Sequence, residues 1–239
     1  MEVPVSIVIP TLNEEKYLRK LLESIKNSTV QPLEVRVADS DSRDGTRKVA
    51  KEYGAIVVDD ERKGPGAGRN KGAEGAKGEY ILFLDSDVIL PHNFLEIAMN
   101  KIEKENLVIA SAFIRPIGGN AFQNFVATLG NIYFYWISFI VPHAGGYCIF
   151  VKREIHEKIK GFDTTLFMGE DHEYSKRARK YGKFGFIEKP LLWVSTRRFK
   201  EEGVLKTASK YFLSELYTLF LGKQTKGRFS FQFGEHFKD

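Results

Sequence analysis

The sequence predicts an α/β fold in which a mostly parallel sheet is flanked by helices. Three observations lead to this prediction. The chain has 239 residues, of which 43% are hydrophobic and 28% charged, so it can build a buried core. Short β-branched runs alternate with amphipathic segments through the first half. Polar residues directly follow several of these runs, where an open α/β sheet binds its ligands.

The first half is expected to hold five strands separated by helices. Each strand is a short apolar run, and the runs span residues 5–9, 33–38, 55–58, 80–84 and 107–114. Asn13 and Asp44 are expected to cap the first two helices, because short polar side chains accept from free N–H groups there. A glycine-rich segment, residues 63–78, leads into a third helix that ends by Gly78. Pro91 is expected at the first position of the fourth helix.

The second half begins with an apolar stretch, since residues 116–151 contain no Asp, Glu, Lys or Arg. Its richest part, residues 125–141, includes Gly130 and Asn131 and is at the lower length limit for a membrane span. We therefore expect a buried or interfacial helix. The elements expected after it are a strand at 147–151, a polar helix from Glu170 or Asp171 to Gly182, short strands at 184–187 and 191–194 around Pro190, and an amphipathic helix at 201–221.

The net charge indicates the kind of partner to expect, and the cysteine content indicates the cellular compartment. The formal net charge is +5, and residues 176–239 alone carry 15 basic and 6 acidic side chains. A basic C-terminal third favours an anionic partner, such as a phosphate or a lipid headgroup, or forms a solvated face. Cys148 is the single cysteine, which favours a reducing compartment. Residues 5–9 are too short for a signal peptide core, so we expect a cytoplasmic protein, with peripheral contact to the membrane left open.

The clearest chemical motif is Asp85-Ser86-Asp87, directly after the run at 80–84. Two carboxylates at the end of a buried strand need a partner, since an ionised group is costly to bury alone. A divalent cation shared with substrate phosphates is a natural partner, and Mg²⁺ or Mn²⁺ suits such oxygen ligands. The alternative is a helix cap in front of Pro91.

Two further segments suit a nucleotide. Asp39 ends the second strand, where its carboxylate could accept from a base or from a ribose hydroxyl. Gly64, Gly66 and Gly68 precede Arg69, and a flexible loop there could close over a nucleotide. Neither the P-loop spacing nor the G-x-G-x-x-G spacing is present, so a surface turn is the alternative.

Charged pairs follow in the second half. Glu170 and Asp171 open a helix, where the helix dipole favours carboxylates, so a plain cap and a general base are both open. Arg197 and Arg198 follow a short strand. Paired guanidinium groups suit a diphosphate through forked hydrogen bonds, and solvated surface arginines are the alternative.

Taken together, these segments resemble the family 2 glycosyltransferases of the GT-A fold. The matching segments lie within residues 3–200, at 10–14 (PTLNE), 38–46, 68–70, 78–87, 161–163 and 169–171. The resemblance implies an inverting, metal-assisted transfer of a sugar from a UDP- or GDP-sugar to an acceptor hydroxyl or phosphate. It implies a catalytic domain at 1–200, with a nucleotide-sugar-binding half at 1–115 and an acceptor-side half at 116–200, followed by an amphipathic helix and basic tail at 201–239.

The resemblance also implies a role for each matched residue. Asp171 would be the catalytic base, and Asp87 would bind the metal ion, Mg²⁺ or Mn²⁺. The residues that would contact the nucleotide sugar are Pro10, Thr11, Asn13, Glu14, Asp39, Arg69, Asp85, Ser86, Arg197 and Arg198. Gly145, Gly146 and Glu170 would lie on the acceptor side.

Two positions depart from the family pattern: Asp41 stands where Gly is usual, and Arg43 replaces a small polar residue, so the nucleobase stays open. The Q-x-x-R-W motif of polysaccharide synthases does not occur, which argues against a synthase. A nucleotidyltransferase would carry a glycine-rich loop after the first strand. A nucleic-acid binder would leave Asp85, Asp87 and Asp171 unexplained, so no nucleic acid is expected. A catalytically silent nucleotide-binding relative, acting as an interaction or membrane-surface protein, stays open.

The acceptor is the least determined partner. The apolar segment 125–141 and the basic aromatic tail suit a lipid-linked phosphate acceptor at a membrane face. The alternative is that the segment packs on the core or forms a homodimer interface.

Overall fold

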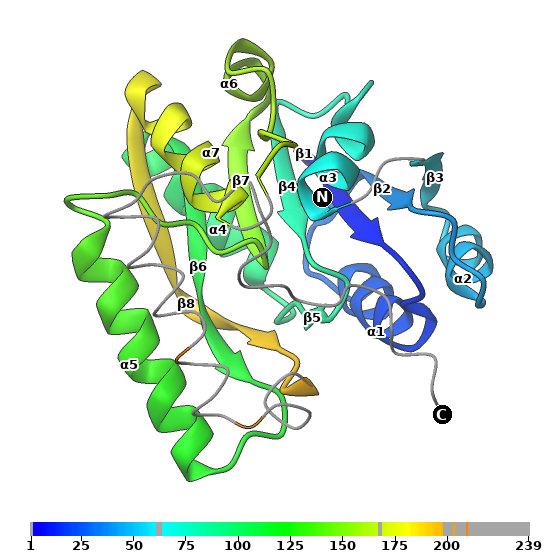
Figure 1. Ribbon diagram of the computed structural model, residues 1–239, viewed down its shortest axis with the longest axis horizontal. Helices are drawn as coiled ribbons and strands as arrows, with labels where there is room; N and C mark the ends of the chain where they lie inside the picture. Colours follow the sequence, from blue (N-terminus) through cyan, green and yellow to red (C-terminus); the bar gives the residue numbers. More distant parts are fainter. Residues whose placement is uncertain (1, 61–63, 167–168, 198–202, 204–208, 210–239) are drawn as a thin grey trace.

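The computed structural model describes residues 2–60, 64–166, 169–197, 203 and 209. In this part of the chain, helices cover both faces of a sheet with the strand order β3-β2-β1-β4-β7-β6-β8-β5 (Figure 1). The strands are β1 Glu2–Thr11, β2 Gln31–Asp39, β3 Ile56–Asp59, β4 Tyr80–Leu84, β5 Val88–Ile89, β6 Leu107–Pro116, β7 Cys148–Lys152 and β8 Lys183–Val194. The helices are α1 Glu15–Lys26, α2 Thr46–Glu52, α3 Pro65–Ala73, α4 Phe94–Glu105, α5 Ala121–Ile137, α6 Arg153–Lys158 and α7 Glu170–Ala178, with a 3₁₀ turn at Arg179–Tyr181.

The sheet is mostly parallel, as predicted. β1 pairs in parallel with β2 and β4, and β2 pairs in parallel with β3. β7 runs antiparallel between β4 and β6, while β6 and β8 are parallel. The carboxyl ends of β1 to β4 consequently open at the same edge of the sheet, which is where such folds bind ligands.

Strand alternation gives the sheet a hydrophobic core on each face. Val5, Ile7 and Ile9 of β1 belong to the core that α1, α2 and α4 cover, whereas Val8 belongs to the core that α3, α6 and α7 cover. Every residue of β4 is buried. A strand covered on both faces is a continuous apolar run in sequence, which is why both strands were predictable.

The start of α1 differs from the prediction. Asn13 does not cap it, because Asn13 has a left-handed backbone with φ 58° and α1 begins at Glu15. The loop after β2 binds the free N–H groups instead. The Glu14 N–H donates to Thr46 Oγ1 at 2.8 Å, and the Glu15 N–H donates to Asp44 Oδ2 at 3.0 Å. The two loops at the edge of the sheet are therefore bound to one another.

The glycine-rich segment contains the predicted third helix, but this helix already begins at Pro65, so Gly66 and Gly68 lie within it and form neither the flexible loop nor the surface turn considered for them. This helix is α3, which lies directly against β1. A Cβ on Gly68 would lie 2.9 Å from Pro10 Cβ, and a Cβ on Gly72 would collide with Val8. Glycine at these two positions, one helical turn apart, allows the helix to approach the strand closely.

Three other expectations need correction. The two short strands expected around Pro190 form one strand, β8, whose Lys189–Pro190 bond is cis. α4 begins at Phe94 and not at Pro91. β5 and α6 were not predicted. Apart from residues 203 and 209, the helix expected at 201–221 and the tail after it lie outside the described residues.

The apolar stretch forms α5, which lies along the edge of β6 (Figure 1). Asn131 is the buried residue of this helix. Its Nδ2 donates to the Ile114 carbonyl at 2.9 Å, and its Oδ1 accepts from the Ile114 N–H at 3.0 Å. These bonds satisfy backbone groups at the strand edge. None of the described helices is long and apolar enough to cross a membrane.

Candidate active site

Polar residues gather where the parallel strands end, as the sequence predicted. Thr11 ends β1, Asp39 ends β2, and Asp85 directly follows β4. Thr11 Oγ1 donates to Asp39 Oδ2 at 3.2 Å. Asp60, which the sequence analysis did not single out, follows β3, is buried, and accepts from Ser40 Oγ at 3.3 Å. Its position directly after a strand was the signal that could have found it.

The carboxylate of Asp39 is buried and held by its own loop. Ser42 donates its N–H to Oδ1 at 3.1 Å and its hydroxyl to Oδ2 at 2.6 Å, and Arg47 Nη1 lies 3.4 Å from Oδ1. Asp41, where the family usually has Gly, has φ 63°. Aspartate tolerates the left-handed region better than most residues, so this departure keeps the turn.

The loop after β1 forms the next part of the edge. The Asn13 N–H donates to Ser42 Oγ at 2.8 Å, and Asn13 Oδ1 accepts from the Arg43 N–H at 2.8 Å. Pro10 packs against Gly68 of α3. The predicted nucleotide-side residues of both loops thus form a single hydrogen-bonded rim.

Glu14 and Asp87 share a cation, Arg197. Its Nη1 and Nη2 donate to the Glu14 carboxylate at 3.1 and 3.2 Å, and Nη2 lies 3.6 Å from Asp87 Oδ2. The guanidinium carbon lies 4.6 Å from the centre of the Tyr17 ring. Burial raises the pKa of Glu14, and the hydrogen bond from Arg197 opposes that shift. Arg197 Nε is buried and has no hydrogen-bond partner among the described residues, so it could donate to a ligand.

A cavity of about 310 Å³ opens beside this cluster. Its lining includes Lys20 of α1, Asp87, and the segment Ser195–Arg197 after β8. Two cations and one carboxylate face the same space. A phosphate and a metal ion would each meet a group of opposite charge there.

Arg69 joins the two acidic motifs. It is 2% exposed; its Nη1 donates to Glu170 Oε1 at 2.8 Å, and its Nη2 donates to Asp85 Oδ1 at 2.9 Å and to the Gly146 carbonyl at 3.1 Å. Burial disfavours the charge of Arg69, but Asp85 and Glu170 outweigh it and raise the pKa of the guanidinium. Burial and the nearby Asp171 raise the pKa of Glu170, while Arg69 opposes that shift.

The carboxylate of Asp171 is oriented by backbone groups. Oδ2 accepts from the Gly146 N–H at 2.8 Å, and Oδ1 accepts from the His172 N–H at 2.9 Å. A Cβ on Gly146 would lie 2.5 Å from Arg69 Nη2, so a side chain there would displace the Arg69 guanidinium. The Gly145 N–H lies 3.3 Å from Ser111 Oγ. Gly146, Glu170 and Asp171, predicted for the acceptor side and the base, do meet at the start of α7.

A divalent ion would need ligands from a bound substrate. Among the residues that the structure describes, no three His, Cys, Asp or Glu side chains are grouped to hold a metal ion. Asp87 borders the cavity with 16% of its side chain exposed, Ser86 is buried, and Asp85 is 34% exposed. One or two carboxylates completed by phosphate oxygens and water is a usual magnesium site, so these residues fit a metal that arrives with a diphosphate. Arg198 lies outside the described residues.

The solved structures that this chain resembles confirm the predicted GT-A fold, a mostly parallel sheet flanked by helices. A mannosyltransferase from Pyrobaculum calidifontis, solved with GDP-Man and Mn²⁺, superimposes with a TM-score of 0.68 at 20% identity, covering 89% of this chain and 65% of that one. Residues 6–160 match the family described as glycosyl transferase family 2. The chain belongs to glycosyl transferase family 2.

Curated relatives agree with the family. An uncharacterized glycosyltransferase of Methanocaldococcus jannaschii is 30% identical over 232 residues, which cover 90% of this chain and 78% of the relative. The GalNAc(5)-diNAcBac-PP-undecaprenol beta-1,3-glucosyltransferase of Campylobacter jejuni is 33% identical over 106 residues, or 40% of this chain and 33% of that protein. The chain spans only part of other curated relatives: the match covers 30% of a putative glycosyltransferase of Bacillus subtilis and 62% of a glycosyltransferase of Haloferax volcanii.

Proposed function

We propose that this chain transfers a sugar from a nucleoside-diphosphate sugar to an acceptor, with inversion at the anomeric carbon. The observation that carries the proposal is the contact of buried Arg69 with both Asp85 and Glu170. This contact fixes the Asp85–Asp87 motif and the Asp171 helix at one edge of the sheet. The structural similarity to a mannosyltransferase that binds GDP-Man and Mn²⁺ supports a nucleotide-sugar donor.

The donor would lie along the nucleotide-side rim. Thr11 and Asp39 would contact the nucleoside, and Asp85 would contact the ribose. Arg197 would turn from Glu14 toward the diphosphate, for which its fork of donors is suited. A divalent ion bound by Asp87 would neutralise charge on the departing diphosphate.

Asp171 is proposed as the general base. The acceptor oxygen forms a bond to the anomeric carbon, the bond from that carbon to the diphosphate breaks, and the acceptor proton passes to Asp171. The N–H groups of Gly146 and His172 hold the carboxylate in place for this transfer. A positioned base typically contributes 10²–10⁴-fold in rate.

The acceptor is proposed to be lipid-linked. The Campylobacter jejuni relative is named for an undecaprenol-linked substrate. In this chain, Phe134 of the apolar helix α5 lies 6.5 Å, between ring centres, from His172, the neighbour of Asp171. An amphiphilic acceptor could rest on α5 while its hydroxyl or phosphate reaches the base.

The test measures nucleoside diphosphate release from a panel of UDP- and GDP-sugars with a lipid-phosphate acceptor, in Mn²⁺, in Mg²⁺ and in EDTA. We expect release from one donor class with metal and none in EDTA. A catalytically silent relative would instead give a thermal shift without release. A ligand at 100 times its dissociation constant adds about 2.7 kcal/mol of stability, so that shift is measurable. The proposal would be contradicted if the panel gave no thermal shift and no nucleoside diphosphate release.

A further inference from the structure

α5 turns its large apolar side chains toward solvent. We define the α5 apolar face as Phe122, Phe125, Leu129, Ile132, Tyr133 and Trp136. These side chains are 42–67% exposed, and Phe139 and Ile140 just beyond the helix are 60% and 79% exposed. At 3.6 residues per turn, the six positions fall within an arc of roughly 100°. Soluble monomers rarely expose contiguous apolar patches of this kind, so the face is expected to be covered in use.

The orientation of the helix is fixed by the opposite side. Asn131 points inward and makes both of its hydrogen bonds to the backbone of Ile114. An amphipathic helix ordinarily buries its apolar residues and exposes its polar ones, but α5 buries Asn131 and exposes Trp136. Rotating α5 to bury its aromatic residues would break both bonds. The outward apolar face is therefore built into the fold.

Basic side chains lie at both ends of the α5 apolar face. At the carboxyl end, Arg179 Nη1 donates to the Ser138 carbonyl at 2.7 Å, and Lys180 and Lys183 beside it are exposed. At the amino end, Arg115 is exposed. Residues 116–151 contain no acidic group. The face is thus apolar along its length and positively charged at its ends.

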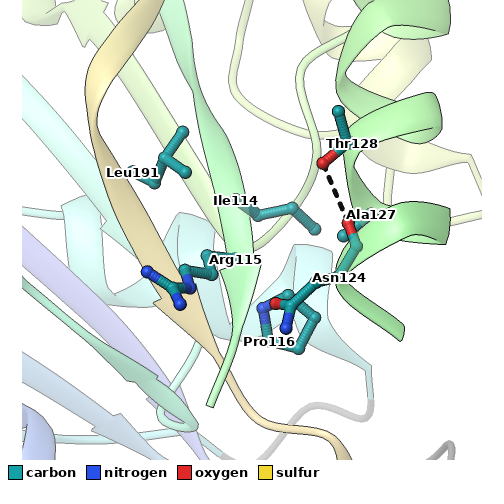
Figure 2. A pocket seen from close by; sticks show the side chains of 7 residues that line it. All are labelled: Ile114, Arg115, Pro116, Asn124, Ala127, Thr128 and Leu191. Carbon is teal, nitrogen blue, oxygen red and sulfur yellow. Dashed lines mark hydrogen bonds between the residues drawn. The ribbon is translucent and has the colours of Figure 1, made fainter. Parts of the chain in front are cut away.

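A cavity of about 290 Å³ lies at the amino end, between β6, β8 and α5 (Figure 2). Arg115, Asn124 and Thr128 supply its polar groups. Asn124 Oδ1 is buried and has no hydrogen-bond partner among the residues described. A guanidinium and an unpaired carbonyl oxygen that line the same cavity suit a ligand that carries both a phosphate and a hydroxyl.

We propose that the α5 apolar face lies in the interface of an anionic lipid bilayer, with the helix parallel to the membrane plane. Tryptophan and tyrosine favour that depth, and the basic ends would contact phosphate headgroups. A second copy of this chain fits less well. Both ends of the face are basic, so a two-fold pairing of the face with itself would bring like charges together in either helix direction.

Binding of the α5 apolar face to a membrane does not depend on catalysis. The further inference that this binding brings a lipid-linked acceptor to Asp171 rests on the proposed function. α5 leads to the segment that holds Gly146. The Phe134 ring contacts the His143 ring, which lies tilted against the His172 ring with 4.2 Å between ring centres. A bilayer under α5 would place Asp171 near the headgroups. A lipid-linked acceptor could then be glycosylated without leaving the membrane.

The first experiment uses the full chain with Trp193→Phe, which leaves Trp136 as the only tryptophan. Vesicles of phosphatidylglycerol and phosphatidylcholine are added without nucleotide or metal. We expect a blue shift of Trp136 emission and quenching by brominated acyl chains. Binding should weaken at least tenfold on pure phosphatidylcholine or at high salt. Failure to bind anionic vesicles would overturn the proposal and leave the transferase proposal intact.

Matched variants separate the outcomes. Trp136→Gln with Ile140→Gln, and separately Lys180→Glu with Lys183→Glu, should each lower the vesicle partition coefficient at least tenfold. The controls, exposed on the far side of the fold, are Ile56→Gln and Lys48→Glu, and each should change it less than twofold. Unchanged binding in the α5 variants would overturn the proposal. Acrylamide quenching of Trp136 emission is also measured without lipid. If Trp136 is already shielded there, another part of this chain or a second copy covers the face, and the proposal is overturned.

Discussion

Glu14 and Arg197 face one another in a two-bond ion pair across 183 residues of sequence, with N–O distances of 3.1 and 3.2 Å. Glu14 precedes α1 and Arg197 follows β8, so the pair joins the first and last described segments of the sheet. The same guanidinium lies 3.6 Å from Asp87. A diphosphate bound at Asp87 would therefore compete with Glu14 for this arginine.

Arg197→Lys is expected to weaken donor binding about tenfold. The lysine keeps the charge but loses the fork that binds a diphosphate, a difference of about 1.4 kcal/mol. Isothermal titration with the nucleoside diphosphate and Mn²⁺ measures it. Arg19→Lys, in the exposed pair with Glu52, is the control and should leave the affinity unchanged. Equal affinity in the Arg197 variant would show that this arginine does not reach the diphosphate.

Asp171→Asn and Asp87→Ala are expected to fail in different steps. The first removes the proton acceptor, so kcat should fall about 10²–10⁴-fold with donor affinity little changed. The second removes the metal carboxylate, so donor affinity should fall and lose its dependence on Mn²⁺. Single-turnover kinetics and donor titration separate the two effects, with Glu173→Gln on the same helix as control. Similar losses of rate and affinity in both variants would contradict these assignments.

Arg69→Met is expected to destabilise the fold by about 3–5 kcal/mol. It leaves the carboxylates of Asp85 and Glu170 without their shared cation, and removing one partner of a buried ion pair costs this much. Urea unfolding followed by circular dichroism measures the change.

The control for Arg69 is Arg19→Met. Arg19 and Glu52 are 45% and 40% exposed along their side chains, and an exposed pair contributes less than about 1 kcal/mol. A loss in the Arg69 variant no larger than that of the control would mean that the two acidic motifs do not depend on the shared cation.

The sequence predicted the strands and the edge of the site because those features are local. β1 and β4 are apolar runs buried on both faces, and their polar ends follow at once in the chain. β8 was divided in the prediction because Pro190 interrupts an apolar run. In the structure, the ladder with β6 skips residues 188–191, so the proline lies where the register shifts. Such an irregularity depends on the partner strand and leaves no local signal.

The contacts that organise the site were not predictable, because they join distant segments. A glycine-rich segment has low helix propensity, yet α3 forms because Gly68 and Gly72 allow it to pack against β1. Arg69 then meets Glu170, 101 residues later, and Gly146, 77 residues later. The motifs identified the residue types, but only the packing of α3 shows that Arg69 is buried between them.

His156 is expected to make stability depend on pH below neutrality. Burial lowers the pKa of His156 from 6.5 to about 4, and its Nδ1 lies 2.8 Å from the Tyr174 hydroxyl. The unfolded chain binds a proton below pH 6.5 and the folded chain does not until about pH 4, so the stabilisation is complete above pH 6.5 and is lost as pH falls to 4. The full loss is about 3 kcal/mol. Urea unfolding at several pH values measures how steeply the free energy of unfolding depends on pH. We expect a smaller dependence in His156→Gln than in the unchanged protein and in the exposed control His92→Gln. The same dependence in all three proteins would contradict this role of His156.

Alanine at two helical glycines is expected to act in opposite directions. A Cβ on Gly72 of α3 would collide with Val8, which is fully buried in β1, so Gly72→Ala should destabilise by about 1–3 kcal/mol through overpacking. A Cβ on Gly130 of α5 would meet nothing within 4 Å, so Gly130→Ala should stabilise by up to about 1 kcal/mol through helix propensity. Thermal unfolding of both variants measures the change in stability. Because both variants replace glycine by alanine, a change of opposite sign reflects the different packing around the two positions. Stabilisation by Gly72→Ala would mean that α3 does not lie against β1 as closely as the structure shows.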